Sequence, residues 1–186
     1  TRKWGSEEAL ATMAWDRIKG VTKRPHMLIG GYGMGFTLRA ALRTLPEDSK
    51  LTVVELVPEI IEWARGPMAE VAQGCLDNPR VNLMMGDVGH VIDAARADYD
   101  AILLDVDNGP DGLVREDNNQ IYSKTGLRAA RNALTPDGVL AIWSAGADSA
   151  FTRRLERAGF KVDEVKVSSR SNGKGPKHVI WFATPE

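Results

Sequence analysis

The stretch Met27–Arg39, MLIGGYGMGFTLR, decides how the rest of the chain is interpreted. An apolar segment leads into glycines at alternate positions, Gly31, Gly33 and Gly35, and then into a segment whose apolar residues recur at helical spacing. Glycine allows positive φ and lets the backbone approach a ligand closely. The stretch therefore predicts a strand, a ligand-cradling turn and a helix. A tight turn without a ligand is the alternative.

Acidic residues follow two further apolar segments. Glu55 ends the segment 51–54 and lies 20 residues after Gly35. This is the spacing at which a carboxylate at the tip of the second strand accepts hydrogen bonds from both hydroxyls of a ribose. Asp87 follows the segment 81–85 and is expected to contact an adenine amine, to cap the next helix, or to do both.

Asp105, Asp107 and Asn108 follow the apolar segment 99–104. Ligands of open α/β sheets bind beyond the carboxyl ends of the strands, so these residues are candidates for contacting the reacting group. Asp105 is suited to bind a cation or an amine, or to act as a general base if burial and Asp107 raise its pKa. Turn formation is the alternative role, because Asp and Asn are frequent turn residues.

Length and composition indicate one domain over residues 1–186, with an N-terminal helix and linker over residues 1–24. The chain of 186 residues is 43% hydrophobic and 26% charged, with a formal net charge of −1, so neither nucleic acid nor membrane is an expected partner. Cys75 is the single cysteine, and no apolar run approaches the ~18 residues of a spanning helix. A cytoplasmic location is expected. A start at Thr1 in place of Met is consistent with an absent N-terminal segment.

Other side chains provide weaker signals. The polar residues 111–122 predict a loop over the site, with Tyr122 as a candidate substrate contact. The three histidines have no ligand spacing, so no metal site is predicted. Trp63, Trp143 and Trp181 occur in apolar patterns and are expected in the core.

These motifs resemble the class I S-adenosylmethionine-dependent methyltransferases, and within them the spermidine synthase-like branch. The similarity extends from Ser6 to Thr184. It implies a Rossmann-like α/β fold, with a seven-stranded, mostly parallel sheet of order 3-2-1-4-5-7-6 and helices on both faces. It also suggests a homodimer. The resemblance depends on the glycine stretch and on four further motifs, residues 54–59 (VELVPE), 77–81 (DNPRV), 99–105 (YDAILLD) and 134–138 (LTPDG).

The resemblance also implies roles for individual residues. The glycine loop would hold the methionine part of the cofactor, Glu55 the ribose and Asp87 the adenine, while Asp105 would face the transferred group. The full set of expected cofactor-binding residues is Gly31, Gly33, Gly35, Glu55, Leu56, Asp87, Val88 and Asp105. The expected catalytic residues are Asp105 and Asp107, and the expected substrate residues are Glu8, Asn108 and Tyr122.

Departures from the branch favour methyl transfer. The aspartate with which aminopropyltransferases hold the cofactor's amine falls on Met34, and the second aspartate of their Asp-Ser-x-Asp motif falls on Asn108. Of their first-helix motif, Tyr-(Gln or His)-Glu, only Glu8 agrees. The sequence therefore predicts an S-adenosyl-L-methionine-dependent methyltransferase with a small-molecule acceptor. Aminopropyl transfer from decarboxylated S-adenosylmethionine is the first alternative, and a non-catalytic cofactor-binding domain is the second.

Overall fold

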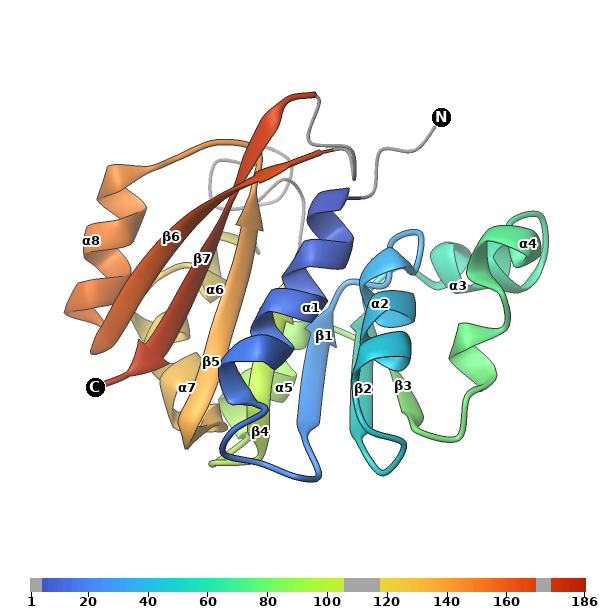
Figure 1. The fold of residues 1–186 in the computed structure, drawn as a ribbon, viewed down its shortest axis with the longest axis horizontal. Coiled ribbons are helices and arrows are strands. Elements are labelled where there is room, and N and C mark those ends of the chain that lie inside the picture. The colour runs from blue at the N-terminus through green and yellow to red at the C-terminus, as the bar shows by residue number, and fades with distance from the viewer. Residues whose placement is uncertain (1–4, 106–117, 170–174) are drawn as a thin grey trace.

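A seven-stranded sheet forms the centre of the molecule (Figure 1), in a computed structural model that describes residues 5–105, 118–169 and 175–186. The strand order is β3-β2-β1-β4-β5-β7-β6, and β7 runs antiparallel to both neighbours while the other pairs are parallel. The predicted fold and strand order are thus confirmed. The strands are β1 (His26–Gly30), β2 (Lys50–Glu55), β3 (Val81–Met85), β4 (Tyr99–Leu104), β5 (Leu134–Ser144), β6 (Phe160–Ser168) and β7 (Lys177–Pro185).

Helices cover both faces of the sheet, and alternate residues of the inner strands are buried on opposite sides. In β1, Met27 and Ile29 enter one apolar cluster and Leu28 the other. None of the helices described is long and apolar enough to cross a membrane. The first cluster includes residues of α1 (Gly5–Ile18), α2 (Phe36–Thr44), α3 (Pro58–Arg65), α4 (Ala69–Ala72) and the short 3-10 helix Cys75–Asp77; the second includes residues of α5 (Val88–Ala94), α6 (Asn118–Ile121), α7 (Lys124–Ala133) and α8 (Ser149–Arg157).

The core prediction for the tryptophans is wrong at one position. Trp181 is fully buried and Trp143 is 8% exposed, but Trp63 is 53% exposed. The reason is helix geometry: Ile61 and Ala64 of α3 are the buried residues of that helix. A residue two positions from Ile61 lies roughly 200° around the helix and faces solvent.

We expect Gly35 to tolerate substitution less well than Gly33. A Cβ on Gly35, where φ is 77°, would lie 2.6 Å from the hydroxyl oxygen of the buried Tyr32, whereas at Gly33, where φ is 53°, nothing lies within 4 Å. Gly35→Ala should lower the free energy of unfolding by about 2–4 kcal/mol, through both backbone strain and overpacking. Gly33→Ala should cost about 1 kcal/mol, from strain alone. Urea unfolding measures both, and equal losses would contradict the position of the Tyr32 ring.

Candidate functional site

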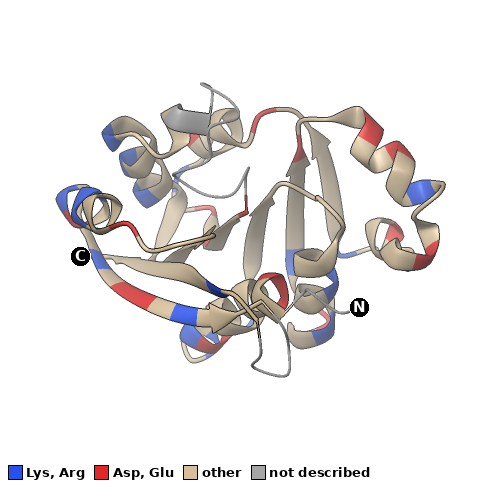
Figure 2. Cartoon of the chain, turned by 90° about the horizontal axis from the view of Figure 1, so that it is seen from above, with Lys and Arg blue, Asp and Glu red and all other residues tan. Residues whose placement is uncertain are grey.

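The site lies at the carboxyl edge of the parallel strands, where the ends of β1, β2 and β4 meet. Hydrogen bonds continue the sheet pattern beyond these ends: Gly31 N donates to Val54 O at 2.8 Å, and Gly86 N donates to Glu55 O at 2.9 Å. Figure 2 looks onto this edge and shows the ribbon coloured red, at acidic residues, near the ends of the central strands, with many of the blue, basic positions on the outer helices. Glu55, Asp87 and Asp105 thus follow or end neighbouring strands at this edge.

The glycine loop between β1 and α2 has left-handed backbone at all three predicted positions. The φ angles are 85° at Gly31, 53° at Gly33 and 77° at Gly35. A Cβ on Gly31 would lie 3.2 Å from the carbonyl oxygen of Asp105, so a side chain there would crowd the end of β4. The predicted turn is confirmed, and at Gly33 its backbone is open to a ligand.

The Glu55 carboxylate joins the glycine loop to the end of β2. It is 5% exposed, and its two oxygens accept hydrogen bonds from the backbone N–H of Tyr32 at 2.8 Å and of Val57 at 2.9 Å. A carboxylate can accept about four hydrogen bonds. The oxygens therefore retain acceptor capacity for two more donors.

Asp87, Val88 and Leu56 border the neighbouring part of the edge. Asp87 Oδ1 accepts from Gly89 N at 2.6 Å, which confirms its predicted role as the cap of α5. The same residue lines a cavity of about 430 Å³ between α5 and α7. Val88 is buried and would contact a Cβ on Gly30 at 3.0 Å, whereas Leu56 is 45% exposed just beyond β2. Binding of adenine by these residues remains a prediction.

A second cavity, of about 190 Å³, lies against the glycine loop. The residues lining it include Glu7, Gly31, Gly33, Met34, Thr37 and Asp105. Asp105 is half-buried at the end of β4. The pKa of its carboxyl is raised to about 7, mainly because burial disfavours the charged form and further because the Glu7 carboxylate is nearby. Asp105 can therefore exchange a proton near neutral pH.

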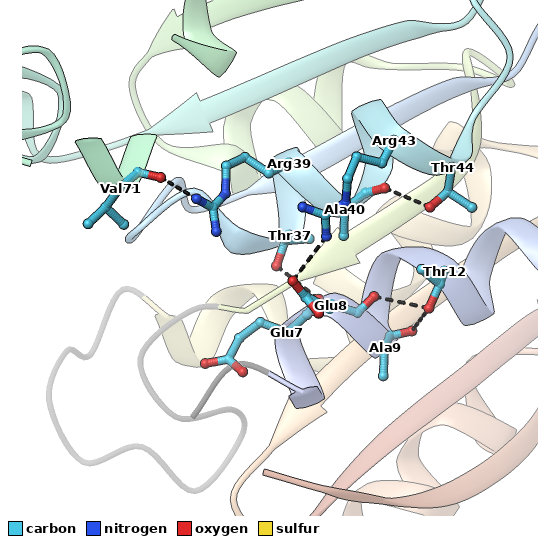
Figure 3. Close-up of polar contacts among 10 residues, drawn as sticks. All are labelled: Glu7, Glu8, Ala9, Thr12, Thr37, Arg39, Ala40, Arg43, Thr44 and Val71. Atoms are coloured by element: carbon cyan, nitrogen blue, oxygen red, sulfur yellow. Dashed lines mark hydrogen bonds and ion pairs between the residues drawn. The ribbon is translucent and has the colours of Figure 1, made fainter. Parts of the chain in front are cut away.

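The first helix contributes Glu7 to this cavity, not the predicted Glu8. Glu8 forms an ion pair with Arg43 of α2 at 3.0 Å, and Figure 3 shows the Glu7 carboxylate pointing away from that pair. Neighbouring residues of a helix point about 100° apart. The sequence predicts Glu8 because its residue type agrees with the first-helix motif. Only the orientation of α1 against the sheet identifies Glu7.

Of the remaining predicted site residues, only Tyr122 belongs to the described part of the chain. Tyr122 is 3% exposed and packs edge-to-face on Phe151, with ring centroids 5.6 Å apart, so it belongs to the apolar cluster beneath α7 and α8 and not to the lining of either cavity. Asp107 and Asn108 lie outside the described residues. In the described part of the chain, no group of three or more His, Cys, Asp or Glu is placed to hold a metal ion.

We expect Glu55→Gln to destabilise the fold even without a ligand. A glutamine offers one carbonyl oxygen, so its amide group would face a backbone N–H that now donates to the carboxylate. The cost of the lost hydrogen bond and the unsatisfied donor should be about 1–3 kcal/mol. Urea unfolding is the measurement, with Glu59→Gln on the exposed side of α3 as the matched control. Equal stability of the two variants would contradict the described role of Glu55.

Comparisons with known proteins identify a family. A family model, the spermine/spermidine synthase domain, matches residues 7–154. A polyamine aminopropyltransferase of Sulfolobus acidocaldarius is 32% identical over 115 residues, 62% of this chain and 37% of that protein. Polyamine aminopropyltransferase 1 of Streptomyces coelicolor is 31% identical over 159 residues, 80% of this chain and 29% of that protein. The crystal structure of spermidine synthase from Thermotoga maritima matches with a TM-score of 0.77 at 19% identity, covering 100% of this chain and 60% of that chain.

The comparisons correct the predicted reaction. The chain spans 37% and 29% of the two curated relatives, and the structural likeness at 19% identity shows the fold alone. The family model is nevertheless named for spermine and spermidine synthases and both relatives for aminopropyl transfer, so the preference for methyl transfer was wrong and the first alternative is better supported. Because the family match extends over residues 7–154 of the 186, the chain belongs to the spermine/spermidine synthase family.

Proposed function

We propose that this domain transfers the aminopropyl group of decarboxylated S-adenosylmethionine to an amine. The observation that carries the proposal is the Asp105 carboxyl, which lines the cavity beside the glycine loop and has a pKa raised to about 7. An amine acceptor is protonated at neutral pH and must lose a proton before its lone pair can attack. A carboxyl with a pKa near 7 is well matched to accept that proton.

The residues around the loop fit the nucleoside end of such a donor. Gly33 leaves the loop backbone accessible, and Glu55 has acceptor capacity for two hydroxyl groups. Leu56 offers exposed apolar surface beside the strand ends, which suits the face of an adenine. These features would hold the donor with its reacting end toward Asp105.

Asp105 would act as the general base of the transfer. The acceptor nitrogen would pass its proton to the carboxylate and bond to the methylene carbon next to the sulfonium. The carbon–sulfur bond would break, and the sulfur would keep the electron pair as a neutral thioether. Holding the nitrogen and the carbon in line would supply much of the acceleration.

Calorimetric titration tests the donor. The protein should bind decarboxylated S-adenosylmethionine, and Glu55→Ala should weaken binding at least about 10-fold, since two hydrogen bonds to ribose are worth more than 1.4 kcal/mol. Glu59→Ala, an exposed change on α3, should leave the affinity unchanged. Product formation across a panel of diamines and polyamines then tests transfer. Binding of the intact cofactor alone, or of neither form, would refute the proposal.

Asp105→Asn should stabilise the ligand-free protein at alkaline pH. The carboxyl has a pKa of about 7 in the folded protein against an ordinary value of 3.8, so the folded protein binds this proton more tightly than the unfolded chain and stability falls as pH rises between these values. The variant should match the wild type near pH 4 and melt roughly 2–6 °C higher at pH 8. Asp137→Asn, at an exposed position of β5, is the matched control. An equal difference at both pH values would argue against the raised pKa.

A further inference from the structure

The Glu7 carboxylate is held in place within the cavity beside the glycine loop. Ser6 Oγ donates a hydrogen bond to Glu7 Oε2 at 2.9 Å. The backbone carbonyl of Glu7 accepts from Thr37 Oγ1 of α2 at 3.3 Å (Figure 3). Glu7 also lies in the first turn of α1, where the helix dipole favours a negative charge. These contacts fix both its backbone and its side chain.

The support for Glu7 extends to β7. His178 Nδ1 lies 3.0 Å from Ser6 Oγ, and Ser6 is fully buried. A serine hydroxyl has one proton, which here points to Glu7, so the ring nitrogen must be the donor to Ser6. The His178 ring packs edge-to-face against Trp143, with centroids 4.8 Å apart. The chain His178–Ser6–Glu7 therefore connects β7 to the cavity.

The charge of Glu7 is not balanced by any described residue. Its neighbour Glu8 has Arg43 as an ion-pair partner, whereas no ion pair to Glu7 occurs within residues 5–105, 118–169 and 175–186. The described residues that line the cavity include no Lys or Arg. Two carboxylates, Glu7 and Asp105, thus border one small space. A cation entering this space would be attracted, and a further carboxylate would be repelled.

We propose that Glu7 determines which form of the donor is accepted, by binding the terminal ammonium of the decarboxylated form and repelling the carboxylate of intact S-adenosylmethionine. This inference rests on the proposed function. The two molecules differ at that end by one carboxylate, so a fixed negative charge is a sufficient discriminator. Ser6 and His178 act as positioning residues. Ser6 donates a hydrogen bond to the Glu7 carboxylate, and His178 contacts Ser6.

The test is calorimetric titration of each variant with both forms of the donor. The wild type should prefer the decarboxylated form, and Glu7→Gln should reduce the preference at least about 10-fold, by weakening that form and strengthening the intact one. Glu8→Gln makes the same change one residue along, where the carboxylate pairs with Arg43, and should keep the preference. Ser6→Ala should lose part of the preference for the decarboxylated form. Its affinities for the two forms of the donor should shift in the same directions as in Glu7→Gln.

Met34 provides a second position at which the charge of the cavity can be changed. Its side chain lines the same cavity and is 43% exposed, so the protein should still fold with a charged residue at this position. Met34→Lys should shift the preference toward the intact cofactor. In the Glu7→Gln background, Met34→Asp should restore preference for the decarboxylated form.

The outcomes separate the two proposals. If the wild type binds neither form, or prefers the intact one, the proposed function fails. If the wild type prefers the decarboxylated form and this preference survives Glu7→Gln, only the role of Glu7 is overturned. Loss of preference in Glu8→Gln but not in Glu7→Gln would assign the role to Glu8. A thermal melt of each variant shows that it is folded, and Ser6→Ala, which removes the hydrogen bond to Glu7 Oε2, decides the question if Glu7→Gln is not.

Discussion

The site depends first on one interaction, the acceptance of two backbone hydrogen bonds by the buried Glu55 carboxylate. A buried charge without partners would cost several kcal/mol. The N–H groups of Tyr32 and Val57 satisfy it, and in doing so they fix the glycine loop against the end of β2. The loop in turn packs against Asp105 through Gly31, where no side chain fits easily. One carboxylate thus determines the relative positions of three strand ends.

The fold could be predicted because its determinants are local in the sequence. The apolar strand, the alternating glycines and the acid 20 residues later specify a strand, a loop, a helix and a second strand. The resemblance supplied the strand order. The cap formed by Asp87 could also be predicted, since capping involves residues only two positions apart.

The parts that could not be predicted depend on contacts between distant residues. Whether Glu7 or Glu8 lines the cavity depends on how α1 is oriented about its own axis, and this orientation cannot be inferred from the residue types. Ser6 and His178 are 172 positions apart and carry no shared motif. Met34 implies the loss of a negative charge when its position is considered alone, but the cavity it lines has a carboxylate, Glu7, from another element. The charge of a site is set by all the side chains that line it, not by one aligned position.

The contact between His178 and Ser6 has a consequence for how the protein is made. The acidic wall of the cavity needs a residue of α1, which the ribosome delivers early, and a residue of β7, which it delivers late. The four parallel pairings among β1–β5 involve only residues up to Ile142, so that part of the sheet can assemble first. Domains fold as synthesis proceeds, and distant contacts form slowly. A nascent chain could thus complete its glycine loop well before the contact between Ser6 and His178 forms.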